Sequence, residues 1–226
     1  MSETPPEGPA LTIDMVSDVV CPWCYVGKRL LETAIASQPE IPVAVSFRPY
    51  FLNPWVPRAG MSREDYLIAK FGSVERYNAA GGRIIEATAA LGLPYDRDKI
   101  KRQPNTLDCH RLISWAGQIG SAAAMKQRLM ELYFGEGGDL TDPDVLAEAA
   151  ADCGLDADAV RARLAGEDDI ARVTAEAQSA HDAGIESVPC FIFGGMIAVS
   201  GAQPPEHLAA AIARAAAEQA RRVAAE

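Results

Sequence analysis

Two cysteines separated by two residues are the side chains of this sequence best suited to covalent chemistry. Cys21 and Cys24 enclose Pro22 and Trp23 in the segment Cys-Pro-Trp-Cys. A thiolate attacks a disulfide, and a second thiol nearby can then displace the partner from the mixed disulfide. We therefore predict that Cys21 is the nucleophile and Cys24 the resolving thiol of a redox-active pair.

The elements on either side of this pair support the prediction. Residues 11–16 alternate between apolar and polar side chains, which predicts a strand. After Cys24, apolar residues recur with helical spacing, and Pro22 suits the first position of a helix. Cys21 would then lie at the N-terminus of this helix, where free N–H groups and the helix dipole favour the thiolate.

A zinc site is the alternative use of such a pair, but it needs two more ligands at similar spacing. No second Cys-x-x-Cys segment exists, and the three histidines, His110, His181 and His207, are scattered. We therefore predict no metal. A metal- or peptide-binding module remains the non-enzymatic alternative.

The composition is that of an ordinary soluble globular protein, with 226 residues, 49% hydrophobic residues and a net charge of −10. This charge argues against nucleic acid and anionic membranes as partners, and no apolar run is long enough to span a bilayer. Residues 1–9 are acidic and rich in proline, so we predict a disordered leader rather than a secretory signal. The odd number of cysteines, five, then fits a reducing cytoplasm.

The remaining chain is predicted to contain one more strand, a long helical region and a terminal hairpin with a helix. Residues 43–47 read as a strand and residues 48–57 as a Pro-rich connection. The segments expected to be helical, bounded by glycines and capping residues, are 62–71, 73–91 with a break at Gly81-Gly82, 104–119, 121–134, 143–153, 156–165 and 167–183. Residues 190–193 and 196–200 flank a Gly-Gly turn, and Pro204-Pro205 opens the last helix.

This order resembles an α/β thioredoxin fold, βαβ…ββα, that carries a large all-helical insertion. It is similar to the DsbA-like group and, within it, to the FrnE-like thiol–disulfide oxidoreductases. The segments that carry the likeness are 17–28, 51–54, 105–112, 184–189 and 200–205. The resemblance implies a thioredoxin-like domain formed by residues 10–60 and 184–226, and an insertion domain formed by residues 61–183.

The resemblance also implies a substrate-binding loop opposite the cysteines, formed by Val188 and a cis Pro189. A cis X–Pro bond costs little, and it would leave the backbone of Val188 free to pair with an extended substrate. Pro22, Trp23, Asn53 and His110 are further candidates for substrate contact. Trp23 is equally well explained by simple packing. His110 is equally well explained by a hydrogen bond to a backbone carbonyl.

Three cysteines lie outside the predicted redox pair. Cys109 and Cys190 stand where the related proteins usually have alanine and an apolar residue, respectively. Cys109 and Cys153 fall on apolar faces of predicted helices, so we expect buried, inert thiols. Strand alternation should turn Cys190 away from the site if Val188 faces it.

The sequence thus predicts a cytoplasmic dithiol–disulfide oxidoreductase or isomerase that acts on protein or small-molecule disulfides. Glutathione or a reductase would be the electron partner, and no bound cofactor is needed. The enzymatic alternative is a glutathione-dependent transferase or isomerase of the kappa and 2-hydroxychromene-2-carboxylate isomerase type, which typically has Ser in place of the first Cys.

Overall fold

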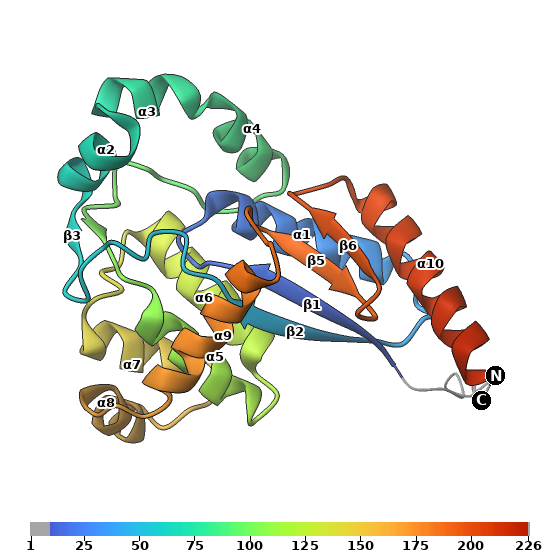
Figure 1. Ribbon diagram of the computed structural model, residues 1–226. Coiled ribbons are helices and arrows are strands. Elements are labelled where there is room, and N and C mark those ends of the chain that lie inside the picture. The colour runs from blue at the N-terminus through green and yellow to red at the C-terminus, as the bar shows by residue number, and fades with distance from the viewer. Residues whose placement is uncertain (1–9, 226) are drawn as a thin grey trace.

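A four-stranded mixed sheet lies at the centre of the computed structural model, which describes residues 10–225; the leader expected at residues 1–9 lies outside this range. The strand order is β2-β1-β5-β6 (Figure 1). β1 (Leu11–Ser17) pairs in parallel with β2 (Val43–Pro49) and antiparallel with β5 (Cys190–Phe193). β5 forms the expected hairpin with β6 (Ile197–Ser200).

The alternation of side chains along β1 divides the core between the two faces of the sheet. Leu11, Ile13 and Met15 are buried in the main core, together with residues of α1 (Pro22–Ala36) and α10 (Pro205–Val223). α10 contacts α1 as well as β1, β5 and β6. These two helices therefore cover one face of the sheet.

The opposite face carries Val16, which packs with Tyr50, Ala180 and Cys190 in a separate cluster. Ala180 belongs to α9 (Ile170–Asp182), which contacts β2. The division of the chain into residues 10–60 with 184–226 and residues 61–183 stays a prediction, and α9 is the part of the second range that reaches this face of the sheet.

The region between β2 and β5 is helical, as expected. Figure 1 shows α2, α3 and α4 as an arch near the end of the sheet where β1 leads into α1, while α5 to α9 form a separate group. The bounds of these elements are α2 (Arg63–Phe71), α3 (Val74–Ala80), α4 (Gly82–Ala90), α5 (Leu107–Gly117), α6 (Ala122–Glu131), the π-helix η1 (Leu132–Glu136), α7 (Pro143–Asp152) and α8 (Ala157–Ala165).

Capping residues fix where several of these helices begin. Ser62, Ser73, Asp142 and Asp156 each accept a hydrogen bond from a backbone N–H of the first helical turn. One feature was not predicted: β3 (Met61–Ser62) pairs with β4 (Arg102–Gln103) in a small antiparallel sheet. Strands of two residues are too short to produce a recognisable alternation. The βαβ…ββα order with its helical insertion is confirmed.

Candidate active site

Cys21 is the N-cap residue of α1, and Pro22 occupies the first position of the helix. Cys21 is only 5% exposed. Its thiol donates a hydrogen bond to the carbonyl oxygen of Val188 at 3.7 Å. The sequence places a proline where no N–H is needed and a thiol where free N–H groups converge. Cys24 follows one turn later and is fully buried.

The two thiols have opposite pKa shifts. The pKa of Cys21 is lowered, mainly by a hydrogen bond from the Cys24 side chain and further by the backbone N–H groups of Cys24 and Trp23. The pKa of Cys24 is raised well above its ordinary value, first by burial and then by its hydrogen bond to Cys21. In the reduced pair, Cys21 is therefore the more acidic thiol, and Cys24 keeps its proton more firmly.

The Val188–Pro189 peptide bond is cis, the isomer implied by the resemblance. Gly27 of α1 lies against this loop: a Cβ built on Gly27 would be 2.8 Å from Pro189 Cγ and 3.2 Å from Phe191 Cζ. Only a residue without a side chain lets the helix and the loop approach this closely. The close contact holds the carbonyl of Val188 beside Cys21.

Three ionisable side chains are buried beneath the cysteine pair. The Asp18 carboxylate accepts a hydrogen bond from the backbone N–H of Leu52 at 2.9 Å, and its other oxygen lies 3.4 Å from His110 Nε2. His110 thus faces Asp18, and it contacts the Phe51 ring at a centroid distance of 5.8 Å. Asp18 raises the pKa of Cys21 through its charge.

Lys126 of α6 is the third of these groups, and it is fully buried. Its Nζ has no hydrogen-bond partner among the described residues and lies 5.6 Å from the centroid of the Phe47 ring. Burial lowers the pKa of Lys126 to about 8, and the charges of Cys24 and Asp18 oppose that shift. Sequence reasoning missed Lys126, although a lysine on the apolar face of α6, beside Met125 and Leu129, was a signal that could have been used.

A cavity of about 380 Å³ opens beside Cys21. Pro22, Trp23 and Val188 line it, as expected for residues that meet a substrate, and Trp23 is 39% exposed. The rest of the wall comes largely from the arch of α2, α3 and α4. The insertion therefore provides one side of the cavity and the cysteine helix the other.

Asn53 and His110 do not line this cavity. Asn53 is buried, and its Oδ1 accepts hydrogen bonds from Lys70 Nζ at 2.5 Å and from the Tyr66 hydroxyl at 3.3 Å. Lys28 of α1 is buried and paired with Glu32 at 2.5 Å. The roles of Asn53 and His110 in substrate binding stay predictions, and any such role acts through a neighbouring side chain.

The other three cysteines have raised pKa values. Burial raises the pKa of Cys109 well above its ordinary value. Cys153, at the C-cap of α7, is half-buried rather than buried as expected, and this partial burial raises its pKa as well. Burial also raises the pKa of Cys190, whose Sγ lies 3.9 Å from Ser200 Oγ. Cys190 packs in the cluster of Val16 and Tyr50 on the α9 side of the sheet. Of the five cysteines, Cys21 is the one poised to react.

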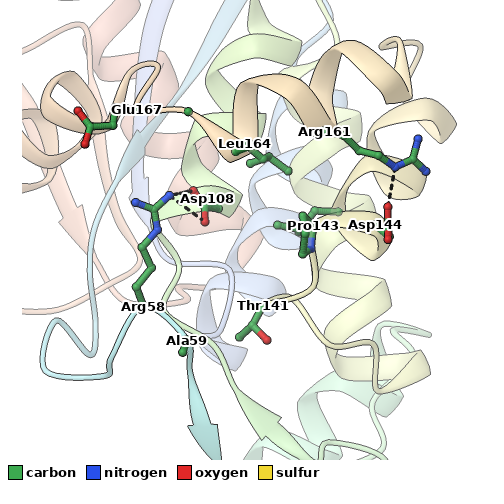
Figure 2. Close-up of a pocket in the computed structure, with 12 residues that line it drawn as sticks. Arg58, Ala59, Asp108, Thr141, Pro143, Asp144, Arg161, Leu164 and Glu167 are labelled. Carbon is green, nitrogen blue, oxygen red and sulfur yellow. Dashed lines mark hydrogen bonds and ion pairs between the residues drawn. The ribbon is translucent and has the colours of Figure 1, made fainter.

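A larger cavity, of about 580 Å³, lies between α7, α8 and the loop before β3, away from the cysteine pair (Figure 2). Its arginines already have carboxylate partners. Arg58 pairs with Asp108 at 3.0 Å and Arg161 with Asp144 at 2.6 Å, as the dashed lines in Figure 2 show. Its size does not make it the site, because no cysteine lines it and its arginines are already paired.

Comparisons with known proteins identify the family to which the chain is similar. The model of the DSBA-like thioredoxin domain family matches residues 12–213. A probable DsbA oxidoreductase from Streptomyces coelicolor is 33% identical, with a TM-score of 0.82 over 91% of this chain and 89% of that protein. No described helix is long and apolar enough to cross a membrane.

Two more distant structures share the fold. A 2-hydroxychromene-2-carboxylate isomerase is 15% identical, with a TM-score of 0.70 over 93% of this chain and 98% of that protein. The cytosolic disulfide reductase DsbM from Pseudomonas aeruginosa, solved with glutathione, is 16% identical, with a TM-score of 0.59 over 94% of this chain and 98% of that protein.

Proposed function

Because the chain belongs to the DsbA-like thioredoxin domain family, we propose that it is a FrnE-like dithiol–disulfide oxidoreductase that works in the cytoplasm through Cys21 and Cys24. One observation carries the proposal: Cys21 caps the start of α1 with a lowered pKa, and Cys24 is fully buried one turn later with a raised pKa. Disulfide exchange needs these two properties, since one sulfur must attack as a thiolate at neutral pH and the other must stay protonated until the mixed disulfide has formed.

The reaction begins when the Cys21 thiolate attacks one sulfur of a substrate disulfide. The substrate S–S bond breaks, a Cys21–substrate mixed disulfide forms, and the other half of the substrate leaves as a thiolate. Cys24 then loses its proton and attacks Cys21 Sγ, which releases the second substrate thiolate and closes the Cys21–Cys24 disulfide. Two electrons pass from the enzyme to the substrate, and the reverse sequence oxidises a substrate dithiol.

Three features near the pair support this sequence of steps. The Val188 carbonyl lies within hydrogen-bond reach of Cys21, so an extended substrate that pairs with this loop would bring its sulfur to the thiolate. Lys126 lowers the pKa of Cys24 through its charge and is thus suited to ease the loss of the Cys24 proton. Trp23, partly exposed beside Cys21, offers an apolar contact to substrate.

Substrates would be protein or small-molecule disulfides, with glutathione or a reductase restoring the enzyme. The second candidate function is a glutathione-dependent transferase or isomerase, which the fold of the 2-hydroxychromene-2-carboxylate isomerase and of the glutathione-bound reductase favours. In that case Cys21 would hold glutathione without Cys24. A buried second thiol in contact with the first favours the redox function.

The redox equilibrium of the pair in glutathione buffers tests the proposal. Purified protein is equilibrated across the range of buffers, the remaining thiols are alkylated, and each cysteine is read by mass spectrometry. We expect a two-electron transition confined to Cys21 and Cys24, unchanged in a Cys109→Ser control. A stable glutathione adduct on Cys21 with Cys24 still reduced would contradict the proposal and favour the transferase. Metal retained by the native protein but lost in Cys21→Ser/Cys24→Ser would favour the binding module instead.

A further inference from the structure

Two cations line the cavity beside Cys21 without a carboxylate in salt-bridge contact. Arg63 and Lys70 line it, and among residues 10–225 neither makes an ion pair. Their hydrogen bonds go to neutral acceptors: Arg63 donates to Gln103 Oε1 at 2.6 Å and to the Tyr77 hydroxyl at 3.1 Å, and Lys70 donates to Asn53 Oδ1 at 2.5 Å. Two cations without an ion-pair partner stand out in a protein whose net charge is −10, and the buried charges of Cys21 and Asp18 act on Lys70 only at longer range.

These cations converge because of their spacing on α2. Seven residues are about two helical turns, so Arg63 and Lys70 lie on the same face of the helix. Both reach the same ring: Arg63 Cζ lies 5.1 Å and Lys70 Nζ 5.7 Å from the centroid of Tyr66. Buried Asn53 supports this arrangement, because its Oδ1 accepts hydrogen bonds from both Lys70 and Tyr66.

The remaining wall of the cavity is apolar and aromatic. The side chains that matter here are Leu52, Phe71, Ile84, Tyr95 and Phe134. With a volume of about 380 Å³, the cavity is large enough for a small organic molecule. A ligand that fits must therefore offer an apolar body to this wall and negative charge to α2.

One carboxylate lines the cavity on the side of the substrate-binding loop. Glu186 is exposed and precedes Val188 by two residues. Its charge repels an anionic group from that side, whereas Arg63 and Lys70 attract the same group toward α2. The charge distribution thus gives a bound anion a preferred direction.

We propose that this cavity selects disulfides of small amphipathic carboxylic acids, with the apolar body against Phe71 and Ile84, the carboxylate beside Arg63 and Lys70, and the sulfur at Cys21. The inference rests on the proposed function and names its substrate class. The chemistry is the exchange described above: Cys21 and Cys24 lose two electrons and two protons, and the substrate disulfide becomes two thiols.

Two matched disulfides test this selection: 4,4′-dithiodibenzoate, with two carboxylates, and 4,4′-dithiodibenzamide, which has the same shape and no charge. The rate constant of each with the reduced protein is divided by its rate constant with a simple thiol in solution, which removes intrinsic reactivity. Changes in the thiolate fraction of Cys21 cancel in the ratio of the two normalised rates. We expect the anionic probe to be favoured by about tenfold, the scale of a charge-assisted hydrogen bond.

Variants show whether the preference comes from α2. Lys70→Gln should reduce the preference for the anionic probe, and Lys70→Glu should reverse it. Arg214 is exposed on α10, so the control Arg214→Gln should leave the preference unchanged. Lys70 is exposed, so its substitution does not disturb a core. High salt should also reduce the preference.

The outcomes separate the inference from the function. If both probes oxidise Cys21 and Cys24 at equal normalised rates, the inference is overturned and the oxidoreductase stands. A preference for the anionic probe that survives in Lys70→Glu overturns it as well. If neither probe closes the Cys21–Cys24 disulfide, the proposed function fails, and the inference fails with it.

Discussion

The imidazole of His110 and the carboxylate of Asp18 meet inside the protein, with 3.4 Å between Nε2 and Oδ1. Asp18 stands three residues before Cys21, whereas His110 comes from α5 in the helical region. The helical region therefore contributes a side chain to the surroundings of the cysteine pair, in addition to one wall of the cavity. It places a group against Asp18, whose charge acts on Cys21.

Asp18→Asn is expected to make Cys21 more acidic. The Asp18 charge raises the pKa of Cys21, and the asparagine keeps an oxygen that can accept the hydrogen bond from the Leu52 N–H. Without the charge, the thiolate persists to lower pH. The pH dependence of iodoacetamide modification at Cys21, followed by mass spectrometry, measures the change, and a profile displaced to higher pH would contradict the electrostatic account.

Replacing Cys24 separates its two roles. Cys24→Ala removes the hydrogen bond that contributes most to lowering the Cys21 pKa, so Cys21 should be modified more slowly at neutral pH. Cys24→Ser keeps a hydroxyl donor and should preserve most of the Cys21 reactivity. Both variants lack the resolving thiol, so mixed disulfides should accumulate and turnover should fall at least about 100-fold, because an intramolecular attack is lost.

Gly27→Ala should destabilise the protein, because a Cβ at this position meets Pro189 Cγ at 2.8 Å. Helix α1 and the loop must move apart, at a cost of roughly 1–3 kcal/mol in the free energy of unfolding. Gly82→Ala at the start of α4 is the matched control, since a Cβ there meets nothing within 4 Å. Its expected effect is a stabilisation of up to about 1 kcal/mol. Urea denaturation of both variants gives the comparison.

Local patterns predicted the four strands of the central sheet and several helix starts because each depends on a short stretch of sequence. Cys21 at the N-cap and the Ser62 cap illustrate this, since both follow from residues within one turn. The helical spacing of Arg63, Tyr66 and Lys70 is a local pattern, but that they line the cavity beside Cys21 could not be predicted, because it depends on tertiary packing. The meeting of His110 with Asp18 likewise joins segments 92 residues apart in the sequence.

Lys126→Met should make the protein more stable and its second step slower. The pKa of Lys126 is about 8 when folded and 10.5 in its ordinary state, so folding disfavours the charged lysine by roughly 3 kcal/mol below pH 8. The unfolded chain binds more protons between pH 8 and 10.5. The stability of the native sequence therefore rises with pH across that window, and the methionine variant lacks this contribution.

The loss of folding stability caused by burying Lys126 is explained if its positive charge promotes deprotonation of Cys24. Lys126 lowers the pKa of Cys24, so in Lys126→Met the resolving thiol should lose its proton less readily and mixed disulfides should persist longer. Urea denaturation at neutral and high pH measures the gain in stability, and rapid acid quenching of the reaction measures the lifetime of the mixed disulfide. A variant that is more stable but resolves the mixed disulfide at the native rate would show that Lys126 has no part in the second step.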